Sequence, residues 1–141
     1  MKANTIKYGF GVTVPVPYAQ AVERTRAALA DEGFGVLTEI DVAATLKKKL
    51  GIERRSYVIL GACNPPLANR ALELEPDIGL LLPCNVVVYD AGEPDGTVVT
   101  ALDPEAMLGL TGRGDVAPLA AEVKERMQRV VQAVATGARS R

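Results

Sequence analysis

The chain contains no histidine and no tryptophan, and its 141 residues include only two cysteines. Without histidine, the familiar histidine-based catalytic triads, imidazole proton relays and imidazole metal sites are all excluded. With four tyrosines and two phenylalanines as its aromatic residues, a stacking platform for single-stranded bases is not expected. Nucleophilic, thiol redox or soft-metal chemistry must therefore involve Cys63 or Cys84.

The chain also lacks an excess of charge of either sign. Lysine and arginine total 16 against 17 aspartates and glutamates, a formal net charge of -1, so nucleic acid and anionic membrane are not expected as partners. No apolar run approaches membrane-spanning length, and Met1–Lys7 lacks the apolar stretch of a signal peptide. These features predict a cytoplasmic protein whose cysteines are reduced thiols.

The length and composition predict one domain over residues 1–141. Hydrophobic residues make up 48% and charged residues 23%, a normal globular balance for a chain long enough to bury a core. The last helical pattern ends at Gly137, and residues 136–141 are expected to form a frayed tail. No internal repeat or interdomain linker is visible.

Alternating or continuous apolar residues predict five strands. These cover Thr5–Val14, Phe34–Ile40, Tyr57–Cys63, Val86–Tyr89 and Thr97–Leu102. In the first strand, Ile6, Tyr8, Phe10, Val12 and Val14 are expected on the buried face. The Pro94-Asp95-Gly96 turn predicts that the last two strands form a hairpin.

Helical spacing of apolar residues and end signals predict helices between these strands. Asp41, Asn64 and Asp115 are the expected N-caps, and Lys47–Lys49 lie in a last turn where the helix dipole favours cations. The long final helix carries a valine-rich stripe from Val116 to Val134. The order of elements predicts an α+β fold, in which helices pack on a mixed, mainly antiparallel sheet.

Each cysteine is followed by asparagine and lies at the end of a predicted strand. Cys63-Asn64 closes one strand before a helix that starts at Pro65, and Cys84-Asn85 opens the next strand. If the chain between them turns back, the two strands are antiparallel and the thiols become neighbours. If it is a single crossover, the strands are parallel and the thiols lie at opposite ends.

Neighbouring thiols would allow three kinds of function. Cys63, near a helix start, could be a reactive thiolate that Cys84 resolves in a thiol redox reaction. Cys63 and Cys84 could hold a soft metal such as Cu(I). Asn64 and Asn85 could orient a small ligand through their amides. The structural alternative is that both cysteines are small buried residues beside capping asparagines.

Three segments resemble the uncharacterised family known as domain of unknown function 302. These are Gly33–Asp41, Gly61–Pro65 and Gly79–Val88. The resemblance implies a compact α+β domain that forms a homodimer, without an established reaction or cofactor. The stripe from Val116 to Val134 is compatible with a dimer face and equally with packing on the sheet.

Together these features predict a small homodimeric domain that binds or senses a ligand. The site would lie around Cys63, Asn64, Cys84 and Asn85 and would take a small molecule or a soft metal ion. A thiol redox protein and a purely structural or interaction module remain the alternatives. Binding is expected rather than catalysis, and the sequence does not identify a cofactor.

Overall fold

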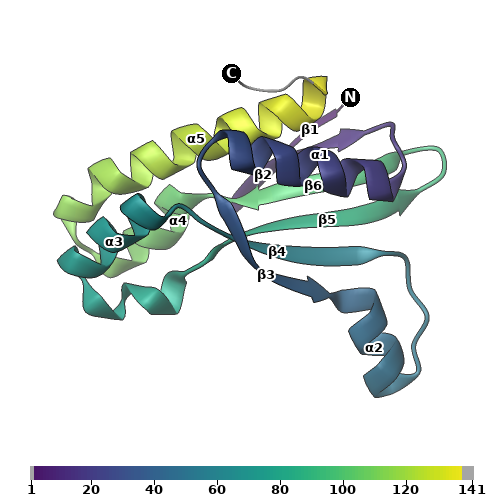
Figure 1. The fold of residues 1–141 in the computed structure, drawn as a ribbon, viewed down its shortest axis with the longest axis horizontal. Coiled ribbons are helices and arrows are strands. Elements are labelled where there is room, and N and C mark those ends of the chain that lie inside the picture. Colours follow the sequence, from purple (N-terminus) through teal and green to yellow (C-terminus); the bar gives the residue numbers. More distant parts are fainter. Residues whose placement is uncertain (1, 138–141) are drawn as a thin grey trace.

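The computed structural model describes residues 2–137 as an antiparallel sheet covered by helices (Figure 1). Six strands follow the order β1-β2-β6-β5-β4-β3. They are β1 (Lys2–Ile6), β2 (Gly9–Val14), β3 (Gly35–Asp41), β4 (Tyr57–Cys63), β5 (Cys84–Gly92) and β6 (Gly96–Leu102). All the strand pairings in this part of the chain are antiparallel. The α+β fold with a mainly antiparallel sheet is therefore confirmed.

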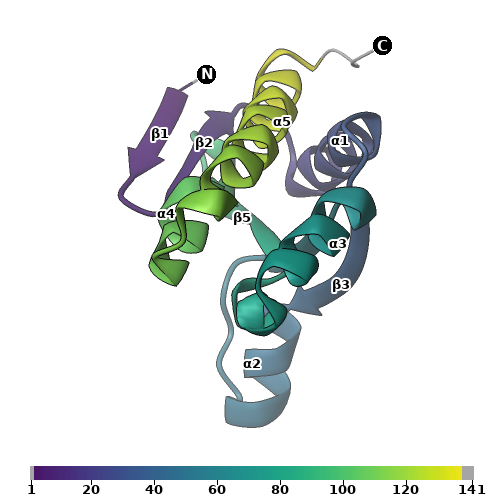
Figure 2. The same ribbon diagram turned by 90° about the vertical axis from the view of Figure 1, so that its left-hand side faces the viewer.

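The helices divide into a packed layer and a projecting helix. They are α1 (Tyr18–Asp31), α2 (Val42–Leu50), α3 (Pro65–Leu74), α4 (Pro104–Leu108) and α5 (Ala117–Thr136), with 3-10 turns η1 (Pro76–Leu81), η2 (Gly109–Thr111) and η3 (Gly114–Val116). Figure 2 shows α1, α3 and α5 on one side of the sheet, whereas α2 extends away from that layer. No helix within residues 2–137 is long and apolar enough to cross a membrane.

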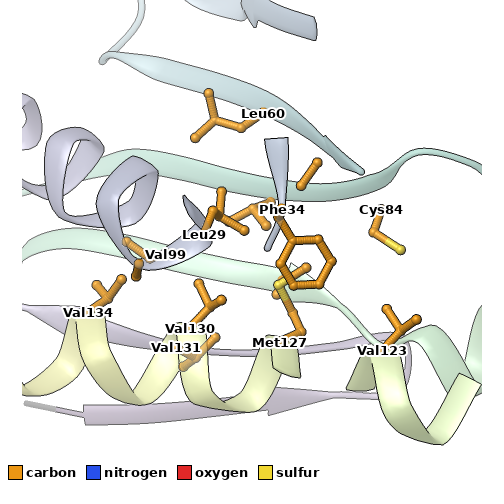
Figure 3. Packing of buried hydrophobic residues seen from close by; sticks show 14 of the residues in the cluster. Leu29, Phe34, Leu60, Cys84, Val99, Val123, Met127, Val130, Val131 and Val134 are labelled. Carbon is orange, nitrogen blue, oxygen red and sulfur yellow. The ribbon is translucent and has the colours of Figure 1, made fainter. Parts of the chain in front are cut away.

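The core lies between the sheet and helices α1 and α5 (Figure 3). Leu60, Val86 and Val99 from the sheet are fully buried, as are Leu29 of α1 and Met127 of α5. The predicted stripe of the last helix also faces this core, through Leu119, Val123, Met127, Val130, Val131 and Val134. The stripe therefore packs on the sheet within one chain, and the apolar side of α5 is not free to form a dimer face.

The predicted helix ends at Asp41 and Gly51 are confirmed. The Asp41 Oδ1 accepts a hydrogen bond from the Ala44 amide at 2.9 Å, and Gly51 closes α2 in the left-handed region at φ 69°, where glycine carries no steric penalty. The lysine run lies in the last turn of α2, and Lys47 pairs with Glu53 at 2.8 Å. Local chemistry thus accounts for this charge run.

The single strand predicted over Thr5–Val14 is wrong. The chain turns between Ile6 and Gly9, so this segment forms the β1–β2 hairpin. Ile6 and Tyr8 are 48% and 65% exposed, not part of the buried face. A period of two continues across a two-residue turn, so alternation alone does not separate one long strand from a hairpin.

Asp115 does not cap the last helix, contrary to expectation. It forms two hydrogen bonds with the Arg113 guanidinium at 2.9 and 2.7 Å, and α5 begins only at Ala117, after a 3-10 turn. The nearby arginine therefore takes the carboxylate that would otherwise cap the helix. At the other end α5 runs to Thr136. Of the frayed tail expected for residues 136–141, only Thr136 and Gly137 lie within the described residues.

Replacing Leu60 tests whether β4 is the centre of the core. Leu60→Ala removes a fully buried side chain, so we expect the free energy of unfolding to fall by about 2–5 kcal/mol. Leu80→Ala is the matched control, because Leu80 is 88% exposed and its loss should change stability by less than about 0.5 kcal/mol. Urea denaturation followed by circular dichroism measures both, and equal losses would contradict the assignment of the core.

Candidate functional site

The sheet brings the two cysteines to adjacent strand ends. Strands β4 and β5 are antiparallel, and Ala62 lies directly opposite Cys84. Cys63 is the next residue of β4, so it lies diagonally across from Cys84. The segment between the strands, α3 and η1, turns the chain back. Of the two topologies considered from the sequence, the antiparallel one therefore holds. Both thiols are free.

A cavity of about 310 Å³ opens beside the cysteines. Ala62, Cys63 and Cys84 contribute to its wall from the sheet, Leu67 and Ala68 from α3, and Val123 from α5. Cys84 belongs to the same buried cluster as Phe34 and Val123 (Figure 3). This lining is almost wholly apolar, so the cavity suits a ligand with little charge.

Asn64 borders the cavity but its side chain has a structural task. Its Oδ1 accepts a hydrogen bond from the Leu67 amide at 3.3 Å, which caps α3, and Pro65 follows in the first turn. Both features agree with the sequence-based expectation. The residue is 8% exposed, so this bond satisfies a buried polar atom.

Asn85 lies apart from the other predicted site residues. It follows Cys84 in β5, and successive side chains of a strand point to opposite faces. Cys84 is buried, whereas Asn85 is exposed and borders a different hollow with Tyr8 and Tyr89. The structure therefore brings Cys63, Asn64 and Cys84 together and leaves Asn85 outside their cavity.

Burial keeps both thiols protonated near neutral pH. It raises the pKa of Cys84 from the ordinary 9.0 to about 11, and the nearby Cys63 adds to the rise. Burial also raises the pKa of Cys63, the reverse of what a reactive thiolate at a helix start requires. The lining therefore presents two neutral, weakly polar sulfur atoms.

The residues available to a metal ion are few. Within residues 2–137, no group of three or more histidine, cysteine, aspartate or glutamate side chains is placed to hold a metal. Cys63 and Cys84 alone would supply two sulfur ligands, and each would first have to lose its proton.

The apolar wall of the cavity was not predicted from the sequence. Leu67 and Ala71 of α3 form an amphipathic stripe, which the helical period predicts as a core face. Both are buried, but they also line the cavity. The only signal in the sequence is the small size of Ala62, Ala68 and Ala71. Alanines are equally common where helices and strands pack closely, so this signal does not predict a cavity.

The pH dependence of alkylation tests the state of the thiols. In the native protein we expect the rate at Cys84 to rise with a midpoint near its pKa of about 11, and that at Cys63 to have a midpoint above 9.0. In guanidinium chloride both should react with the ordinary cysteine profile. Iodoacetamide labelling followed by peptide mass spectrometry measures each site. A midpoint for Cys63 below about pH 7 would show an activated thiolate instead.

Substituting Asn64 tests its capping role. Asn64→Ala removes the acceptor for the Leu67 amide, so unfolding should cost about 1 kcal/mol less. Asn64→Ser keeps a capping oxygen and should retain most of the stability. Thermal denaturation compares the two variants. Equal destabilisation would mean that Asn64 acts through something other than the cap.

Comparisons with known proteins agree with the fold and the sequence resemblance. The family model described as "Domain of unknown function DUF302" matches residues 10–134. The crystal structure of an uncharacterized conserved protein DUF302 from Bacillus stearothermophilus is similar, with a TM-score of 0.81 and 30% sequence identity over 90% of this chain and 98% of that chain. The chain matches no curated protein. Because the family model extends from β2 into the last turn of α5, the chain belongs to the DUF302 family.

Proposed function

We propose that the protein is a homodimeric domain that binds a small, mainly apolar molecule in the cavity beside Cys63 and Cys84. The observation that carries this proposal is the cavity itself. Its volume of about 310 Å³ falls in the range of roughly 300–1,000 Å³ typical of small-molecule sites. Such sites are mostly apolar with a few polar groups, as this one is.

The side chains around the cavity support binding. The cavity has space because three of its lining residues are alanines, Ala62, Ala68 and Ala71. Larger apolar side chains at these positions would fill the cavity and stabilise the fold, so the open space is not required by folding. At the rim, Leu37 and Leu72 are 66% and 42% exposed. A bound apolar molecule would shield these leucines from water, which favours binding by about 25 cal/mol per Å² of apolar surface buried.

The state of the thiols favours a neutral ligand over the alternatives. Soft-metal binding at Cys63 and Cys84 and thiol redox chemistry both need a thiolate, and burial raises the pKa of both groups. As protonated thiols the cysteines act as small, polarisable contacts for an apolar molecule. Free thiols also fit the reducing cytoplasm, where we place the protein.

Filling the cavity tests the proposal. The fluorescence of N-phenyl-1-naphthylamine rises in an apolar site, so we expect a saturable increase with the wild-type protein. Ala68→Phe puts a ring into the cavity and should weaken binding by at least about tenfold. Ala121→Phe is the matched control, because Ala121 is an exposed residue of α5, and it should leave the affinity unchanged.

Two outcomes would contradict the proposed binding. If the wild-type protein shows no saturable fluorescence, the structural alternative without a ligand is favoured. If Ala68→Phe binds the probe as tightly as Ala121→Phe, the probe occupies another surface. A parallel competition for Cu(I) against a chromogenic chelator tests the metal alternative. If the protein binds copper through its thiols, Cys63→Ser should lower the amount of copper that it retains.

A further inference from the structure

The sheet has a second face that the helical layer does not cover. Side chains alternate along β5, where Val86 and Val88 are fully buried beneath the helices, whereas Val87 between them is half-buried. We call this second side the open face. Its central row is Ile40, Ile59, Val87, Thr100 and Gly11, each opposite the next on a neighbouring strand.

The central rows of the open face hold few charged residues, although the Arg54 guanidinium lies over the Tyr57 ring, 5.8 Å from its centroid. The next row consists of Tyr57, Tyr89, Val98 and Thr13, followed by Lys2 on the edge strand β1. Lys2 is the one charged residue of the two rows, in a chain with 23% charged residues. An antiparallel sheet that faces water normally alternates apolar with polar positions. Depletion of charge and the presence of tyrosine are instead typical of the core of a protein interface.

The open face combines stacked rings, a position without a side chain and a hollow. The rings of Tyr57 and Tyr89 are stacked, with centroids 5.2 Å apart and planes 5° apart. In the central row Gly11 leaves no side chain, because a Cβ there would overlap the backbone of Val99 and Thr100. Beside the stacked rings the open face is hollowed, with Val87, Tyr89 and Thr100 at the border of the hollow. A second sheet that packs here would fill this hollow with its side chains.

The size of the open face approaches what a stable dimer requires. Six strands spaced by about 4.8 Å span roughly 24 Å, and seven residues along a strand span roughly 23 Å. The product is a plane of about 550 Å², which does not include the extra surface of the projecting side chains. A standard interface buries about 800 Å² per partner. A neighbouring element could supply the difference.

Helix α2 is such an element. It has nine residues and no buried one, and isolated helices of this length are marginal in water. Leu50 at its end and Ile52 after it are 65% and 47% exposed. Figure 2 shows α2 extending from the sheet away from α1, α3 and α5. It would therefore gain stability by packing against a second body placed on the open face.

We infer that the open face is where two copies of this chain meet, around a two-fold axis near Val87 and Thr100. These two residues face each other at the middle of the strand order. In a two-fold interface each residue near the axis meets its own copy, so a charged residue there would repel its mate. The central row has no charge, which suits a second copy in particular. This inference rests on the homodimer part of the proposed function.

Charge placed near the axis tests the inference. Sedimentation equilibrium should give the wild-type protein twice the chain mass of 14.9 kDa. Val87→Lys and Val87→Glu should each weaken dimerisation by at least about tenfold, because like charges meet at the axis. An equimolar mixture of the two variants should regain the dimer mass. Leu80→Lys, at an exposed position on η1, is the control and should remain dimeric.

The outcomes separate this inference from the proposed function. A monomeric wild-type protein would overturn both the homodimer and the open-face interface. The binding of N-phenyl-1-naphthylamine tests the cavity separately, because it does not depend on the dimer. A wild-type dimer that Val87→Lys leaves intact would overturn the open face alone. Dissociated variants that fail to recover on mixing would overturn the position of the axis. Circular dichroism checks folding, and Thr100→Lys with Thr100→Glu replaces the pair if a Val87 variant does not fold.

Discussion

The pairing of β4 with β5 is the constraint on which the candidate site depends. Because these strands run antiparallel with Ala62 opposite Cys84, the chain between them has to leave and return at the same end of the sheet. Helix α3 and η1 make that excursion, and α3 supplies Leu67 and Ala71 to the cavity. A parallel pairing would have placed the cysteines at opposite ends and left no shared wall.

The packing on the sheet decides which surfaces remain available to partners. Helices α1 and α5 use the covered face, with Leu29, Met127 and Val134 fully buried there. Two further apolar surfaces remain within residues 2–137: the cavity at the strand ends, whose wall is partly made by this core, and the open face. The two surfaces differ in shape. A concave apolar site suits a small molecule, whereas a broad sheet face with few charged residues in its central rows suits a second protein surface.

Features set by neighbours in sequence were predictable from the sequence, and features set by distant contacts were not. The caps at Asp41 and Asn64 and the strand Tyr57–Cys63 follow from local chemistry and were predicted correctly. Asp115 failed as a cap because Arg113 competes for its carboxylate. The cavity could not be predicted, because it depends on how far α3 stands from α5. The open face could not be predicted from the sequence either, because a valine such as Val87 within an apolar strand is expected in the core.

We propose that the cavity beside Cys63 and Cys84 binds an apolar molecule. The most direct test of this proposal is a methyl NMR titration of the protein with N-phenyl-1-naphthylamine, which reports the place of binding residue by residue. We expect saturable shifts in the methyl groups of Leu67, Ala71 and Val123, which line the cavity, with Val87 of the open face unchanged. Shifts confined to Val87 and Ile59, or no saturable shift, would contradict it.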